Sequence, residues 1–263
     1  MMRFYDQLGN ECCLEKFPTR IISLVPSQSE LLFDLGLTNE VVGITKFCIH
    51  PKEWFDTKTR IGGTKTVDFE KVKSLCPDLI IGNKEENTKQ DIEALMKIAP
   101  VWMSDITTLE DALEMIASIG KITNTRVLAN GMISKIRDGF HEIKNDAPTI
   151  SCAYLIWKQP YYLAGKETFI DAMLNFCQLK NFCNEVRYPE WKLELEVSPQ
   201  VIFLSSEPYP FKVEDVVEMQ KRYPNALVLL VDGEMFSWYG SRLLLSFAYL
   251  KALRTKIQNH FTE

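Results

Sequence analysis

The fold is decided by the stretch RIISLVPSQSELLFDLG, residues 20–36. Its first part, residues 20–25, is a short β-branched and apolar run that lies between two prolines, which is typical of a buried strand. A helix is predicted directly after it. Ser27 and Glu30 have the spacing of a capping box, the leucines that follow form an apolar stripe, and Gly36 suits the left-handed position that ends a helix. The stretch is therefore predicted to be a strand, a tight turn and a helix.

Strands and helices alternate along most of the remaining chain. The pattern predicts strands at residues 40–45, 78–82, 101–104, 149–157, 201–204 and 227–231, and helices at 68–75, with Asp68 as N-cap, 88–98, 168–176 and 241–257. Residues 108–147 have a helical pattern alone, broken at 123–125. Such alternation indicates parallel sheets covered by helices. The predicted fold class is α/β: two Rossmann-like lobes, residues 1–106 and 148–263, bridged by a long helical segment, residues 107–147.

Composition excludes several classes of partner. The 30 basic and 35 acidic residues give a net charge of −5, and no basic block forms a footprint for nucleic acid. Apolar runs such as residues 226–231 are far shorter than the ~20 residues that span a bilayer, so membrane insertion is not expected. Residues 1–15 lack the pattern of a secretory signal. The seven cysteines are odd in number and irregularly spaced, which indicates a reducing cytoplasm rather than a disulfide framework.

Sequence signatures of enzymes are missing. Dinucleotide-binding, P-loop, α/β-hydrolase and zincin motifs do not occur, and the three histidines are His50, His141 and His260. No catalytic residue is therefore expected. Cys48 and His50 could both contact a metal that other groups hold, but two ligands do not build a site. No metal site and no intrinsic cofactor are predicted.

Loops at the carboxyl ends of the predicted strands are the candidate binding site, because open α/β sheets place their ligands there. Three such loops cover residues 45–50, 82–87 and 205–211, and a fourth, residues 232–242, is rich in aromatic side chains. Exposed aromatics suit a flat or macrocyclic small molecule, although core packing of the same rings is the alternative. The predicted ligand-binding residues are Phe47, His50, Lys84, Glu207, Phe236, Trp238 and Tyr239.

Several motifs together resemble a known family. They are residues 20–36, 42–45 (VGIT), 61–63 (IGG), 67–80 and 164–168 (AGKET). This combination resembles the helical-backbone (class III) substrate-binding proteins of ABC importers, and among these most of all the cobalamin binders. The resemblance implies two α/β lobes bridged by a long helix. It also implies that cobalamin, haem, an iron chelate or a metal ion binds in the cleft, and that one acidic residue per lobe docks on a membrane permease.

The resemblance carries over to individual residues. Glu70 matches the first docking position; Glu194 is expected to be the second, with Glu196 as a competitor in a stretch that is shorter than in the family. Phe47 matches an aromatic residue that lines the cobalamin cleft. However, Thr64 and Asn83 stand where the cobalamin binder has tryptophan. The ligand is therefore expected to differ, or to be held by Trp238 and Tyr239 instead.

These observations support three hypotheses. The first is a monomeric substrate-binding protein of an ABC-type uptake system, which carries cobalamin or another metal chelate and has a permease as partner. It is periplasmic by family resemblance. The second is a cytoplasmic carrier or sensor of a corrinoid or metal chelate, in agreement with the absent signal and the free cysteines. The third is a metal-assisted enzyme that uses Cys48, His50 and Glu207.

Overall fold

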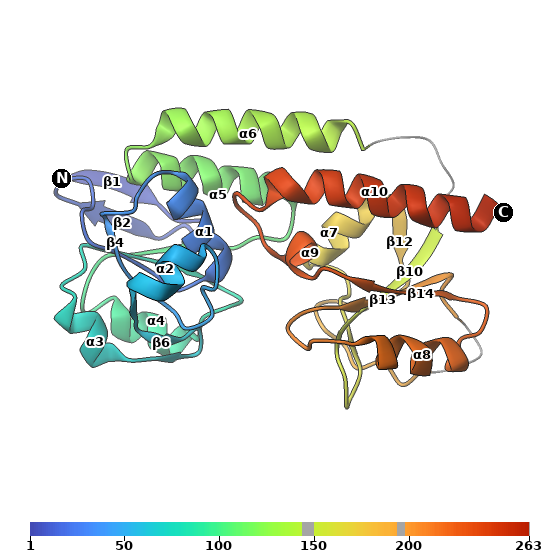
Figure 1. The fold of residues 1–263 in the computed structure, drawn as a ribbon. Coiled ribbons are helices and arrows are strands. Elements are labelled where there is room, and N and C mark those ends of the chain that lie inside the picture. Colours follow the sequence, from blue (N-terminus) through green and yellow to red (C-terminus); the bar gives the residue numbers. More distant parts are fainter. Residues whose placement is uncertain (144–149, 194–197, 263) are drawn as a thin grey trace. The chain divides into compact units, whose positions relative to one another are not determined.

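The computed structural model describes residues 1–143, 150–193 and 198–262 (Figure 1). These residues form two compact units. Unit 1 consists of Met1–Ile106, Glu110–Lys135 and Tyr239–Arg242, and unit 2 consists of Thr107–Leu109, Ile136–Trp238 and Leu243–Glu263. Both units therefore contain residues of the segment 107–147. The boundaries 1–106, 107–147 and 148–263 stay a prediction.

Unit 1 is built on a five-stranded sheet in which every pairing is parallel. The strand order is β5 (Thr59–Arg60), β4 (Val41–Ile44), β3 (Ile21–Ser23), β8 (Leu79–Asn83) and β9 (Val101–Ser104). The helices that connect these strands are α1 (Pro26–Asp34), α2 (Lys52–Thr57), α3 (Phe69–Ser74) and α4 (Lys89–Leu95). Two antiparallel pairs stand apart from the sheet: β1 (Met2–Tyr5) with β2 (Glu11–Leu14), and β6 (Gly62–Gly63) with β7 (Thr66–Val67). The prediction of a parallel sheet is confirmed.

Local sequence patterns predict one helix start of unit 1 correctly and another wrongly. Asp68 caps α3 as predicted, because its carboxylate accepts a hydrogen bond from Lys71 N at 3.1 Å. The capping box of Ser27 and Glu30 was wrong. The N-cap is Val25, two residues before Ser27, so that helix α1 begins with Pro26 in its first turn, and no side chain caps it. Proline suits this position because its missing N–H would have no partner there.

Unit 2 contains a second sheet, in the order β11 (Tyr162–Leu163), β10 (Ile150–Trp157), β13 (Val201–Ser205) and β14 (Leu227–Val231). Strand β12 (Leu179–Asn181) also pairs with β10. Only β11 is antiparallel to its neighbour. The helices of this unit are α7 (Phe169–Phe176), α8 (Val213–Arg222), α9 (Glu234–Ser237) and α10 (Leu243–Thr262). One core cluster of unit 2 joins strands β10 and β13 to α8 through Leu155, Leu204 and Met219.

The strand-free stretch forms two helices, α5 (Leu109–Ile122) and α6 (Arg126–His141). Asn124, at a φ of +61°, lies in the predicted break between them. Helix α6 supplies residues to both units, those up to Lys135 to unit 1 and those from Ile136 to unit 2. A single helix therefore carries the chain from one unit into the other. Among the described residues, no helix combines the length and the apolar character needed to cross a bilayer.

Candidate ligand-binding site

Parallel strands end at the same edge of a sheet, so the loops that follow them gather there. We call residues 45–50, 83–87 and 105 the unit 1 edge, because they follow β4, β8 and β9. Residues 157–161, 206–211 and 232–238 form the unit 2 edge, after β10, β13 and β14. The two edges contain all the predicted ligand-binding residues except Tyr239, which belongs to unit 1.

The loop after β4 directs two neighbouring side chains in opposite directions. Phe47 is 50% exposed, and Lys46 Nζ lies 5.1 Å from its ring centroid. Cys48 is fully buried; Ser29 Oγ donates to its Sγ at 3.0 Å, and Thr45 Oγ1 lies 3.2 Å from it. Burial raises the pKa of the Cys48 thiol, which keeps it protonated. Phe47 is therefore exposed at the unit 1 edge, whereas Cys48 is buried inside the unit.

Asn83 and Asn87 build the loop after β8. The Oδ1 atom of Asn83 accepts hydrogen bonds from Glu85 N at 2.8 Å and Glu86 N at 3.1 Å. Asn87 Oδ1 accepts from Asn83 N at 2.9 Å, while its Nδ2 donates to Thr64 O at 2.9 Å. Asn83 is buried. Asn83 stands where the cobalamin binders that the sequence resembles have tryptophan. Here its side chain holds the backbone of the loop instead.

The same loop presents Lys84 at the unit 1 edge. Its Nζ lies 2.5 Å from Asp105 Oδ2, and its backbone N donates to Ser104 O at 2.9 Å. The next two residues along the chain, Glu85 and Glu86, add two carboxyl groups. Burial raises the pKa of Glu86, and the nearby Glu85 carboxylate raises it further. The edge thus combines one aromatic ring, an ion pair and two carboxyl groups. His50, at the end of the first loop, is half-buried.

Glu207 is held firmly at the unit 2 edge. Ser237 Oγ donates to its Oε1 at 2.5 Å, and its own backbone N donates to Ser205 Oγ at 3.3 Å. Gly233 lies against it, because a Cβ atom added there would come within 2.5 Å of Glu207 Cγ and 2.4 Å of Ser205 Oγ. Gly233 N also donates to Ser206 Oγ at 2.9 Å. Only glycine at position 233 leaves room for the Glu207 side chain here. The Glu207 carboxylate is therefore held in one position.

The aromatic segment 232–242 divides between the units. Phe236 has 0% exposure, and its ring centroid lies 5.0 Å from that of Tyr154 and 5.8 Å from that of Phe203. The structure therefore places Phe236 in the core of unit 2, in agreement with the alternative of core packing, and its selection as a ligand-binding residue stays a prediction. Trp238 belongs to unit 2 and Tyr239 to unit 1, and both are largely buried. Their selection as ligand-binding residues stays a prediction.

Two aromatic residues of the unit 2 edge were missed. Trp157 is the exposed last residue of β10, and Tyr209 follows the neighbouring strand β13. Their ring centroids lie 5.7 Å apart in an edge-to-face arrangement. The predicted strand 149–157 contains Trp157 and the candidate loop 205–211 contains Tyr209, but neither residue belongs to the predicted ligand-binding set. The two residues lie close together because β10 and β13 are neighbouring strands, and knowledge of this pairing would have indicated both.

Metal binding has little support in either unit. Among the described residues, no group of three or more His, Cys, Asp or Glu side chains is arranged to hold a metal ion. Of the predicted permease-docking residues, Glu70 is exposed on α3, where Lys73 Nζ lies 2.8 Å from its Oε1. Glu194 and its competitor Glu196 lie outside the described residues.

The family model for periplasmic binding proteins matches residues 21–215. This span includes the unit 1 edge and most of the unit 2 edge. The chain belongs to the periplasmic binding protein family. Members of this family bind ligands and are not enzymes, so the prediction that the chain is not an enzyme is confirmed and the hypothesis of a metal-assisted enzyme is wrong.

Relatives of this periplasmic binding protein agree with the assignment. An uncharacterized ABC transporter substrate-binding lipoprotein, YvrC of Bacillus subtilis, is 29% identical over 188 residues, which are 67% of this chain and 59% of that protein. The chain thus spans less than two thirds of YvrC. The vitamin B12-binding protein of Pectobacterium carotovorum is 22% identical over 239 residues, 87% of this chain and 86% of the relative.

Solved structures show the same fold. The periplasmic haem-binding protein RhuT of Roseiflexus, in its apo form, superimposes with a TM-score of 0.78 at 16% identity, over 91% of this chain and 99% of that structure. The fold class predicted from the sequence, the helical-backbone periplasmic binding protein fold, is therefore confirmed. The matched span of the family model ends before residues 232–242, which contain Trp238 and Tyr239.

Proposed function

We propose that the chain is the substrate-binding protein of an ABC-type uptake system and that it carries cobalamin or a related metal chelate. The observation that carries this proposal is an exposed aromatic side chain at each edge, Phe47 in unit 1 and Trp157 in unit 2. Corrin and porphyrin rings are large and flat, so they lose much apolar surface to water when they stack on aromatic side chains. The similarity to a vitamin B12-binding protein over 87% of the chain supports cobalamin as the first candidate.

Polar side chains would orient the ligand on these rings. Lys84 is held by Asp105 at the unit 1 edge, and Glu207 is held by Ser237 at the unit 2 edge. Such fixed groups give specificity to an otherwise apolar site. His50, Trp238 and Tyr239 complete the proposed set from the sequence, and Trp157 and Tyr209 extend it from the structure.

The test is a titration of the purified protein with cyanocobalamin, haemin and ferrichrome, followed by calorimetry and by the fluorescence of its five tryptophans. We expect saturable binding of one of them at micromolar affinity or tighter, on the order of −8 kcal/mol. Phe47→Ala should weaken this binding by roughly tenfold. Ile49→Ala is the matched control, because Ile49 is an equally exposed apolar residue of the same loop. Absence of binding to all three ligands would refute the proposed ligand class.

We further propose a periplasmic or membrane-anchored location and a permease partner that Glu70 and Glu194 contact. Glu70→Ala should abolish uptake in cells while the purified protein keeps its ligand affinity. Glu93→Ala is the control, because Glu93 is an exposed carboxylate on the neighbouring helix α4 and also pairs with a lysine of its own helix. Equal loss of uptake in both variants would contradict a specific docking role. A monomer is expected in solution.

A second candidate, a cytoplasmic carrier or sensor of the same ligands, is favoured by the cysteines. All seven are free thiols, and Cys76 is exposed. Free thiols persist in a reducing compartment. Fractionation of cells that produce the protein distinguishes the candidates: recovery with the periplasmic or membrane fraction supports an importer, and recovery with the cytosol supports the carrier.

A further inference from the structure

The hairpin turn between β1 and β2 has a fixed conformation. Asp6 is buried, and its Oδ1 accepts hydrogen bonds from Leu8 N at 3.0 Å and Asn10 N at 2.7 Å. Asn10 Nδ2 donates to the other carboxylate oxygen at 3.1 Å. Gly9 has a φ of +83°, which glycine adopts without strain. This turn lies outside the span of the family model, which begins at residue 21.

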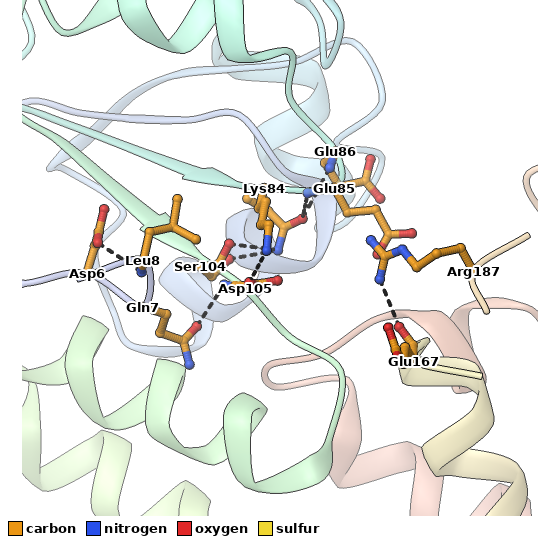
Figure 2. A network of polar contacts seen from close by, with 11 residues as sticks. Asp6, Gln7, Leu8, Lys84, Glu85, Glu86, Ser104, Asp105, Glu167 and Arg187 are labelled. Carbon is orange, nitrogen blue, oxygen red and sulfur yellow. Dashed lines mark hydrogen bonds and ion pairs between the residues drawn. The ribbon is translucent and has the colours of Figure 1, made fainter. Parts of the chain in front are cut away.

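Gln7 joins the turn to the chain that follows β9. Its backbone N donates to Met103 O at 3.0 Å. Its side-chain Oε1 accepts from Asp105 N at 3.2 Å (Figure 2). Its Nε2 donates to Asp111 O at 2.9 Å. An amide is needed here because one end must accept a hydrogen bond and the other must donate one. The hairpin therefore determines the position of Asp105.

Asp105 in turn determines the position of Lys84. The Lys84 side chain is long, exposed and flexible, and Asp105 Oδ2 at 2.5 Å is the contact that selects one of its orientations. An ammonium group has three donors, so it can keep this ion pair and still contact an anionic group on a ligand. Gln7, Asp105 and Lys84 form a connected series from the hairpin to the unit 1 edge.

We infer that Gln7 is a positioning residue of the ligand site and that it acts through Asp105 on Lys84, which contacts an anionic substituent of the ligand. The inference rests on the proposed function. Gln7 itself does not touch the ligand. It holds the backbone N–H of Asp105, whose carboxylate pairs with the lysine, and the bonds between Asp6 and Asn10 fix the turn that contains Gln7.

The test compares each probe with a derivative that lacks its anionic group. Cyanocobalamin is paired with dicyanocobinamide, which lacks the phosphodiester, and haemin is paired with its dimethyl ester. Gln7→Ala should weaken binding of the anionic probe roughly fivefold, the loss that one or two hydrogen bonds would cause, and leave the derivative unchanged. Lys84→Met should weaken the same probe at least as much, and Gln7→Ala should then have no further effect in the double variant. Leu8→Ala is the matched control, because it removes an exposed side chain of the same turn.

The outcomes separate the two claims. Binding of none of cyanocobalamin, haemin and ferrichrome by the unaltered protein overturns the proposed ligand class and this inference with it. Binding of ferrichrome alone, a neutral chelate, leaves the proposed function standing and overturns the inference. Binding that Phe47→Ala weakens but Lys84→Met does not leaves the proposed function standing and overturns the inference. Equal losses for a probe and its uncharged derivative in Gln7→Ala, or an effect that persists in the Lys84→Met background, show a general structural role and overturn the inference as well. All titrations are made well below the melting temperature of each variant.

Discussion

Arg242 and Glu30 form a two-point ion pair across 212 positions of the chain. Arg242 Nη2 lies 2.7 Å from Glu30 Oε1, and its Nε donates to Oε2 at 2.9 Å. The side chains are 9% and 16% exposed, and both residues belong to unit 1. Planar guanidinium and carboxylate groups match well in this geometry. The pair attaches the segment Tyr239–Arg242 to helix α1.

Arg242→Met is expected to destabilise the protein by about 3 kcal/mol at pH 7, because it leaves a buried carboxylate without its partner. Burial raises the pKa of Glu30, and Arg242 offsets part of this rise. A carboxyl group with a raised pKa binds its proton more tightly in the folded state, so its contribution to stability decreases as the pH rises above 4.5. The variant should therefore lose more stability at pH 7 than at pH 5. Urea unfolding at both values measures this, and Lys251→Met, which breaks an exposed pair with Glu142, should cost less than ~1 kcal/mol.

Lys158 should stabilise unit 2 in a pH-dependent way. Its Nζ lies 2.6 Å from Asp215 Oδ1 and 2.7 Å from Glu218 Oε2, and the Lys158 and Asp215 side chains are each 14% exposed. Burial tends to raise the pKa of Asp215, but the hydrogen bonds from Lys158 and the backbone of Lys212 outweigh it and lower the pKa below 3.8. A lowered pKa stabilises the fold above pH 3.8, and this stabilisation is lost as the pH falls through the folded-state value.

Lys158→Met is accordingly expected to cost about 2 kcal/mol at pH 6 and clearly less at pH 2.5, because the stabilisation that comes from the lowered carboxylate pKa decreases as the pH falls below 3.8. Thermal unfolding at the two pH values provides the measurement. Lys73→Met removes an exposed i,i+3 ion pair with Glu70 and should have almost no effect. A loss that is the same at both pH values would show that Lys158 contributes by packing alone.

Replacement by alanine at two glycine positions should change the stability of the protein in opposite directions. Gly233→Ala places a Cβ atom against Ser205 and Glu207, so we expect a loss of 1 to 3 kcal/mol, roughly, together with weaker ligand binding as the carboxylate shifts. Gly131→Ala, within helix α6, meets no atom within 4 Å and should stabilise the protein by about 0.5 to 1 kcal/mol. Guanidinium unfolding and ligand titration on both variants make the comparison. Unchanged affinity in Gly233→Ala would show that Glu207 does not contact the ligand.

Alanine substitutions of Phe236 and Phe47 should have different effects, the first on stability and the second on ligand binding. Phe236→Ala removes a fully buried ring and is expected to cost roughly 3 to 5 kcal/mol. Phe47→Ala removes a ring that is half exposed and should cost less than ~1 kcal/mol of stability while it weakens ligand binding. Denaturation midpoints and dissociation constants of the two variants test this assignment. A large loss of stability in Phe47→Ala would place its ring in the core.

Strong local patterns made much of the fold predictable. Strands β9 and β14 have the predicted bounds because each is an apolar run with clear punctuation. The hairpin β1–β2 was not predicted, since its strands are short and its turn is closed by the side chain of Asp6 rather than by a familiar dipeptide. Helix α8 was also missed: its Val213 and Val217 face solvent, which weakens the apolar stripe that sequence reasoning depends on.

The candidate site was predictable at the level of loops but not of side chains. The rule that ligands bind at strand ends located the loops that contain Phe47, Lys84 and Glu207. It could not show that Phe236 points into the core, because a four-residue helix, α9, changes the direction of neighbouring side chains. No sequence pattern pointed to Gln7, because its side chain contacts residues that lie more than ninety positions away along the chain.

The segment Tyr239–Arg242 also determines how the gene can be divided. Unit 1 draws these four residues from near the carboxyl end, while the chain before and after them belongs to unit 2. A fragment that ends after helix α6 would therefore lack Arg242 and keep Glu30, the unfavourable half of a buried ion pair. Neither unit corresponds to one continuous length of coding sequence. Recombination that replaces unit 1 by that of a relative must therefore also replace residues 239–242, or it produces a protein that folds poorly.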